Sequence, residues 1–238
     1  MKTFIPLILL CILCINTASA VDAKRFAWEQ GSVTYDVSGA CTGTEILKWK
    51  DFGRRKALYA TNKLNLLGFT QETRTLMLSK GANEYSVNLK DKNGTLKTNK
   101  VLDELYATND TEETISKHLL IQQGAKEVGN KNILGMQCIE WQIKRNRSTT
   151  TTCLTEDGIP LEIISSVAGG SHHSLAVAVN REPVSDAEVS LPKDIIIQTE
   201  GSADNKLVKA LKKTQQSKET LNCLAHDKDK ASSTLITK

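Results

Sequence analysis

Hydrophobic and polar residues alternate with a period of two in the first third of the chain. Val33, Tyr35 and Val37 alternate with Thr34 and Asp36. This period is typical of a strand that places one face on a core and the other in solvent. Comparable segments predict further strands at 45–50, 56–64, 70–79 and 84–90. The dipeptide Asn93-Gly94 then predicts a tight hairpin-type turn.

The pattern changes to a helical spacing near residue 100. Leu102 and Leu105 are spaced as on one helix face, and a second apolar stripe follows a capping signal at Asp110 and ends at Gly124. We therefore predict one or two short helices within residues 99–123. They separate two runs of strands.

Strand-like segments resume after the predicted helices. They lie at 125–130, 135–144, 148–154, 160–165, 175–184 and 195–198. About six strands, a helical crossover and about five more strands predict one mainly β domain over residues 26–200. The remainder, 201–238, is Lys-rich, with one short helical pattern at 207–211 and a polar tail that we expect to be disordered.

The first twenty residues have the pattern of a secretory signal peptide. A basic start is followed by an apolar run over residues 4–15 and by the small residues Ala18 and Ala20. We expect removal of residues 1–20 and export of the rest, to the periplasm or, alternatively, to the medium. No later segment reaches the ~20 apolar residues of a membrane span.

Charge and aromatic content argue against some classes of partner. Without Lys2 the chain has 30 basic residues against 27 acidic ones, and aromatic residues are only 5% of the chain. So small and evenly spread an excess does not indicate nucleic-acid binding, and few aromatics are available to stack on bases or sugars.

Four cysteines follow the predicted signal peptide, and an even number in an exported chain favours disulfides. With a two-residue turn at Arg145-Asn146, Cys138 faces Cys153 across a hairpin, which predicts a bridge between them. Cys41 and Cys223 suggest a second bridge that pins the C-terminal helix to the β domain. Unpaired thiols or an intermolecular bond remain open for that second pair.

Several short segments, taken in order, resemble one family. They are 42–49 (TGTEILKW), 51–55 (DFGRR), 133–138 (ILGMQC), 153–154 with 158–161 (CL and GIPL), and 191–195 (LPKDI). The order is similar to that in exported bacterial proteins of unknown function that resemble the outer-membrane lipoprotein carrier, the LolA-like superfamily. The resemblance covers roughly residues 28–198.

The resemblance implies a strongly curved, unclosed antiparallel β-barrel with helices covering its concave face. In the carriers, an apolar cavity between sheet and helices takes up acyl chains. A curved sheet with one apolar face needs a covering of this kind, because the apolar face is otherwise exposed to solvent. The segment after Gly201 lies outside the resemblance.

No motif in the chain indicates catalysis or a resident cofactor. There is no G-x-S-x-G, no phosphate-binding glycine loop and no zinc-type spacing of Cys and His. His172 and His173 follow Gly169-Gly170-Ser171, which predicts an exposed loop; on a strand, these neighbours would point to opposite faces. We expect no enzyme activity, no cofactor and no metal site.

Two functional hypotheses follow. The first is an exported, non-enzymatic binding protein that accommodates a hydrophobic ligand, a lipid acyl chain or a lipoprotein, between sheet and helices. Candidate ligand-binding residues are Ile139, Trp141 and Ile143 on one strand face, together with Trp49, Leu119 and Leu120. The alternative is a cell-envelope interaction module with a filled core and no ligand, which docks a partner protein through its surface or its Lys-rich C-terminal segment.

Overall fold

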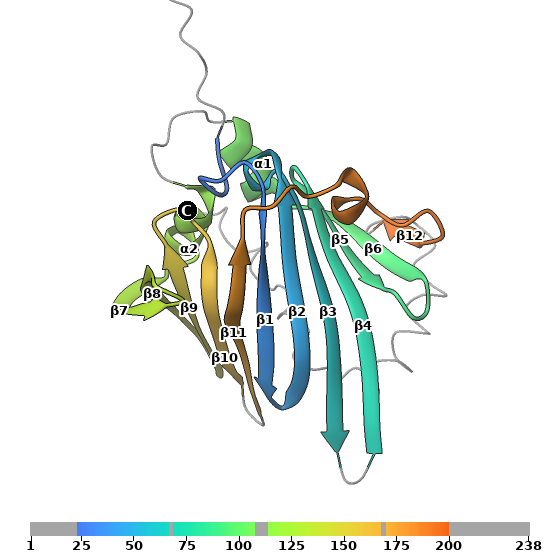
Figure 1. The fold of residues 1–238 in the computed structure, drawn as a ribbon, viewed down its shortest axis with the longest axis horizontal. Helices are drawn as coiled ribbons and strands as arrows, with labels where there is room; N and C mark the ends of the chain where they lie inside the picture. Colours follow the sequence, from blue (N-terminus) through green and yellow to red (C-terminus); the bar gives the residue numbers. More distant parts are fainter. Residues whose placement is uncertain (1–22, 67–68, 108–113, 168–169, 200–238) are drawn as a thin grey trace, which may run out of the picture.

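One continuous sheet of twelve strands organises the protein (Figure 1). The computed structural model describes residues 23–66, 69–107, 114–167 and 170–199. The strand order is β12-β6-β5-β4-β3-β2-β1-β11-β10-β9-β8-β7, so β12 and β7 are edges and the sheet does not close. The predicted class, a mainly β, curved and unclosed barrel with few helices, is confirmed.

The first half of the chain forms six strands joined as antiparallel hairpins. They are β1 (Gly31–Gly39), β2 (Cys41–Lys50), β3 (Arg55–Leu66), β4 (Phe69–Lys80), β5 (Asn83–Asn88) and β6 (Asn93–Thr98). A short 3-10 turn, η1 (Asp51–Gly53), connects β2 to β3. β6 was not predicted from the sequence.

The second half adds two helices and six strands. They are α1 (Lys100–Ala107), α2 (Ile115–Gln122), β7 (Lys126–Ile133), β8 (Met136–Arg145), β9 (Ser148–Thr155), β10 (Pro160–Val167), β11 (Gly170–Asn180) and β12 (Ile196–Thr199), with the 3-10 turn η2 (Asp186–Val189) before β12. β11 pairs with β1 and so joins the two halves. β12 runs parallel to β6 at the far edge.

The turn predicted at Asn93-Gly94 is wrong, because both residues begin strand β6. The β5–β6 hairpin turns over residues 89–92 instead. The side chain of Asn88 accepts hydrogen bonds from the backbone N–H groups of Lys90 and Asp91, at 2.9 and 3.0 Å. This side chain organises the turn, with Lys92 in the left-handed region at φ 54°.

Helices α1 and α2 lie together at the end of the sheet where β1 begins (Figure 1). Leu102, Leu105 and Ile115 pack with Ala23 in one buried cluster that joins the two helices to the N-terminal segment. Asn99 caps α1 by accepting a hydrogen bond from the backbone N–H of Leu102 at 3.1 Å. The helices predicted within 99–123 are confirmed.

Direct antiparallel pairing identifies which side chains share a face of the sheet. Trp49 pairs with Lys56, and Leu47 pairs with Val33 on one side and Leu58 on the other. We call the face that carries these residues the Trp49 face. Trp49 itself is fully buried there, with its ring 4.8 Å from Phe26 between centroids.

The opposite face is covered over β3–β5 by the segment that follows β11. Leu76 and Val87 are buried on this face and pack with Val184 and Val189 of that segment. Lys50 and Arg55 bind Asp186 at 2.8 and 2.9 Å and fix η2 at the sheet.

Candidate functional site

A row of paired residues crosses the Trp49 face from one half of the sheet to the other. From β8 to β3 its members are Trp141, Thr152, Ile163, Ser174, Val37, Gly43 and Asn62, each directly opposite the next. Ile143 belongs to the adjacent row, which includes His172 on β11. Predicted ligand-binding residues therefore share a face with a group of polar residues that the sequence did not indicate.

The predicted ligand-binding residues divide among several places in the structure. Ile139, Trp141 and Ile143 lie on the Trp49 face of β8; Trp141 is 9% exposed and the two isoleucines are half-buried. Trp49 lies in a filled cluster with Phe26 and Trp28, and its ring nitrogen donates to the Trp28 carbonyl oxygen at 3.1 Å. Leu119 packs in the separate helix cluster, and Leu120 is half-buried on the same helix.

Three of the polar residues on the Trp49 face are hydrogen-bonded to one another. Ser174 Oγ donates to Glu45 Oε2 at 2.8 Å and lies 2.8 Å from His172 Nε2. His172 Nε2 is also 3.6 Å from Glu45 Oε1. We call Glu45, His172 and Ser174 the polar cluster; Ser174 is 1% exposed and Glu45 is 8% exposed.

The hydrogen bonds of the polar cluster leave buried polar atoms unsatisfied. A hydroxyl has one proton to donate, and Ser174 donates it in the hydrogen bond to Glu45. In its contact with His172 Nε2, Ser174 Oγ is therefore the hydrogen-bond acceptor. His172 Nδ1 is then buried without a partner, and so is Asn62 Oδ1 at the β3 end of the row that contains Ser174. Burying a polar atom without a hydrogen bond is costly, which makes these atoms candidates for contact with a ligand.

Tyr35 lies next to the cluster and stays protonated. It pairs directly with Glu45, and its hydroxyl donates to the Pro160 carbonyl oxygen at 2.8 Å. Burial raises the pKa of Tyr35 far above its usual range, and the negative charge of Glu45 raises it further.

The geometry of the cluster does not resemble that of a serine nucleophile. In a catalytic triad the imidazole takes the serine proton and a carboxylate orients the other imidazole nitrogen. Here the serine hydroxyl donates its hydrogen bond to a carboxylate, and the second imidazole nitrogen, His172 Nδ1, has no partner. What the cluster offers is hydrogen-bonding capacity on a face where apolar residues alternate with hydroxyl-bearing ones.

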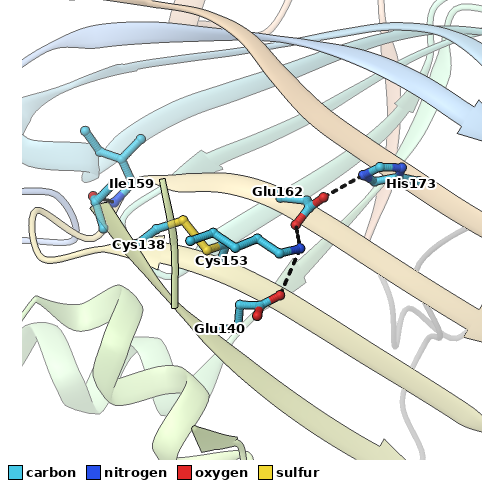
Figure 2. The surroundings of a disulfide bond; sticks show 8 residues. Cys138, Glu140, Cys153, Ile159, Glu162 and His173 are labelled. Carbon is cyan, nitrogen blue, oxygen red and sulfur yellow. Dashed lines mark hydrogen bonds and ion pairs between the residues drawn. A yellow bond between two sulfur atoms is a disulfide. The ribbon is translucent and has the colours of Figure 1, made fainter. Parts of the chain in front are cut away.

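The predicted loop at His172 and His173 is wrong, because both residues lie on strand β11. Their side chains point to opposite faces, as expected for neighbours on a strand. His173 Nε2 lies 2.9 Å from Glu162 Oε1 on the face opposite Trp49 (Figure 2). Within the described residues, no group of three His, Cys, Asp or Glu side chains is placed to hold a metal ion.

Glu162 and His173 belong to a charged network whose members come from four strands, β7, β8, β10 and β11. Lys131 Nζ lies 2.9 Å from Glu140 Oε1 and 2.5 Å from Glu162 Oε2. These hydrogen bonds raise the pKa of Lys131. Burial acts to raise the pKa of Glu162, but hydrogen bonds from Lys131 and His173 outweigh it, and the net pKa is lowered.

The disulfide between Cys138 and Cys153 is confirmed and lies beside this network (Figure 2). The register predicted for its hairpin is wrong, because Arg145 pairs with Ser148 and the turn is therefore Asn146-Arg147. Cys138 faces Thr155, and Cys153 faces Glu140. The two cysteines are thus diagonal neighbours, with Cα atoms 5.3 Å apart.

The second predicted bridge, between Cys41 and Cys223, stays a prediction. Cys41 is buried at the start of β2, and Cys223 lies outside the described residues, as do the predicted signal peptide and the C-terminal extension. In the part of the chain that the structure describes, no helix is long and apolar enough to cross a membrane.

The chain matches no family model, and none of the curated proteins. Solved structures with a similar arrangement include an uncharacterised conserved protein from Thermus thermophilus, at 9% identity and a TM-score of 0.41 over 71% of this chain and 90% of that one. A beta-barrel-like protein of domain of unknown function DUF1849 from Brucella abortus matches at 8% identity and a TM-score of 0.40, over 65% of this chain and 98% of that one. PNGF-II matches at 14% identity and a TM-score of 0.42 over 76% of this chain, but this chain covers only 33% of PNGF-II. Likenesses this weak carry no argument about function.

Proposed function

We propose that this chain is an exported, periplasmic, non-enzymatic binding protein of the LolA-like kind. Its ligand would be hydrophobic, a lipid acyl chain or the acylated part of a lipoprotein. It would lie along the Trp49 face of the sheet. The disulfide between Cys138 and Cys153 supports export, because such bonds persist in oxidising compartments.

The observation that carries the proposal is the row that includes Trp141, Ile163 and Ser174. It supports a site in which apolar side chains flank a few convergent polar groups, the usual composition of ligand pockets. Ile139, Ile143 and Ile163 remain half-buried on this face, and Met77, across the sheet, is 40% exposed. Each CH₂ group that a ligand buries there would contribute about 0.8 kcal/mol.

An interaction module without a ligand is the second candidate, and the filled cluster around Trp49 favours it. That part of the face is fully buried by Phe26 and its neighbours and leaves no room for an acyl chain. Under this alternative, the half-buried isoleucines of β8 and β10 would contact a partner protein.

Native mass spectrometry of protein purified from its own host, followed by lipid extraction, tests the proposal. We expect a bound species whose mass corresponds to one acyl-chain lipid per protein. Protein that carries no lipid, and that takes up none from detergent-solubilised host membranes, would contradict the binding function and leave the interaction module. A partner protein lost on deletion of residues 204–238 would support that alternative.

A further inference from the structure

A second group of charged residues lies on the Trp49 face, at its α1 end. Lys56 pairs with Trp49 on β2 and with Ser79 on β4, and Ser79 pairs with Glu84 on β5. Lys56 and Glu84 therefore share the Trp49 face in one row. Arg25 belongs to the segment before β1, and its positive charge lowers the pKa of Lys56.

The backbone of Arg25 is held firmly at this position. Its N–H donates to the Phe52 carbonyl oxygen at 2.9 Å, and its own carbonyl oxygen accepts from Ser116 Oγ at 2.9 Å. Gly53 leaves no room for a side chain beside it, since a Cβ there would lie 2.9 Å from Arg25 Cβ. The Arg25 side chain therefore starts from a fixed point between η1 and α2.

The guanidinium of Arg25 has a buried N–H group without an acceptor. Arg25 Nη1 is shielded from solvent and has no hydrogen-bond partner. A buried cationic donor without an acceptor is among the costlier polar arrangements in a protein interior. The Tyr106 hydroxyl is hydrogen-bonded to the Arg25 side chain, so what Nη1 lacks is one further oxygen atom. A negatively charged oxygen would also offset the repulsion between Arg25 and Lys56.

The electrostatics agree with a local excess of positive charge. Burial and, to a smaller extent, the charge of Arg25 lower the pKa of Lys56 to about 7, and Glu84 opposes them only in part. Burial also raises the pKa of Tyr106 on α1, while the charges of Arg25 and Arg54 and the hydrogen bond with Arg25 act in the opposite direction. Arg54 lies 5.0 Å from the centre of the Tyr106 ring.

A surface hollow lies beside this region, on the side of Tyr106. It has a volume of about 310 Å³, and Arg54, Asp103 and Tyr106 are among the residues that line it. Because Tyr106 belongs both to the lining and to the surroundings of Arg25, the hollow adjoins the charged group. We propose that Arg25 and Lys56 form a binding site for an oxyanion, a carboxylate or a phosphate, at the α1 end of the Trp49 face.

This oxyanion site does not depend on the function proposed above. A carboxylate or phosphate group could belong to the head of an amphiphile whose chain lies along the Trp49 face, or to a free anion. Both would use the same atoms, because a guanidinium and an ammonium bind such oxygens through charge-assisted hydrogen bonds.

Titration of the full-length chain with sulfate, at constant ionic strength with chloride, tests the site. We expect saturable binding that Lys56→Met weakens by at least about tenfold, the loss of one charge-assisted hydrogen bond. Lys63→Met is the matched control, since Lys63 is exposed on the same strand, and it should leave the affinity unchanged. If Lys56→Met does not fold, Arg25→Gln takes its place, with the same expected loss.

Absence of saturable sulfate binding, or equal binding by Lys56→Met and Lys63→Met, would overturn the site. Comparison of dodecanoate with dodecanol distinguishes the source of the anion. A preference for dodecanoate that disappears in Lys56→Met supports the site as one for a lipid headgroup. Sulfate binding without that preference supports it as a site for a free anion. If the proposed binding of a hydrophobic ligand on the Trp49 face fails instead, the protein will have no affinity for dodecanol.

Discussion

Ser174 and Glu45 are hydrogen-bonded at 2.8 Å although their strands are not neighbours, because β1 lies between β11 and β2. The contact extends across Val37, the residue of β1 that pairs directly with Ser174. The long Glu45 side chain reaches across the width of β1, so one buried hydrogen bond joins β2 to β11 over the strand between them.

Removal of the Ser174 hydroxyl should destabilise the fold. Ser174→Ala leaves the buried carboxylate of Glu45 and the imidazole of His172 without their shared partner, so we expect a loss of about 1–3 kcal/mol in the free energy of unfolding. Urea denaturation measures it. Ser171→Ala, at an exposed position on the same strand, should change the value by less than about 0.5 kcal/mol. Equal effects of the two substitutions would show that the buried hydrogen bond contributes nothing.

The disulfide should contribute strongly to stability. It closes a loop with a sequence separation of 15 residues, for which about 3 kcal/mol is expected. The double variant Cys138→Ala/Cys153→Ala should lose about that amount in denaturant unfolding. Peptide mapping of the oxidised protein should recover these two cysteines in one linked pair. Recovery of Cys138 linked to Cys41 or Cys223 would contradict the hairpin.

Lys56 should make stability depend on pH in the neutral to alkaline range. Its pKa is lowered to about 7 in the folded protein from the ordinary lysine value of 10.5. Between these two values the unfolded chain binds more protons, so folding stability rises with pH in that window. Lys56→Met should be more stable than the parent protein below pH 7, and the difference should shrink as the pH approaches 10. A difference that is constant with pH would contradict the burial of the ammonium.

Glu162 should give stability a different pH dependence, confined to acid pH. Its net pKa is lowered from 4.5, and its side chain is only 10% exposed. The stabilisation by Lys131 and His173 is therefore fully present above pH 4.5 and is lost as the pH falls through the folded-state pKa. Glu162→Gln should cost about 2 kcal/mol at pH 7. Its unfolding midpoint should converge with that of the parent protein at low pH, and parallel curves down to pH 2 would refute the ion-pair network.

The strand pattern could be predicted because alternation of side chains is a local property. Val33, Tyr35 and Val37 are all buried, as their period of two requires. The hairpin registers could not be predicted to the residue. The β5–β6 turn depends on the side chain of Asn88, and a shift of the turn from Arg145-Asn146 to Asn146-Arg147 changed every pair between β8 and β9.

The polar cluster could not be predicted because its members are far apart in the sequence. Glu45 and Ser174 are separated by 129 positions, and only the pairing of β11 with β1 brings them together. The Gly169-Gly170-Ser171 segment before His172 suggested a loop. One signal was present: Leu175, Val177 and Val179 alternate with small residues, and this pattern could have been extended back toward His173.

The most direct test of the central claim uses two neighbouring isoleucines. Ile163 lies on the Trp49 face, whereas Ile164 pairs with Thr151 and His173 on the opposite face, and both are half-buried on β10. Delipidated protein would be titrated with diphenylhexatriene, a neutral apolar fluorophore that does not engage the oxyanion site. Ile163→Thr should weaken binding roughly 5- to 30-fold, the equivalent of about 1–2 kcal/mol of lost apolar contact, while Ile164→Thr should bind as the parent protein does. No saturable binding by the parent protein, or equal losses in the two variants, would contradict a hydrophobic ligand site on the Trp49 face.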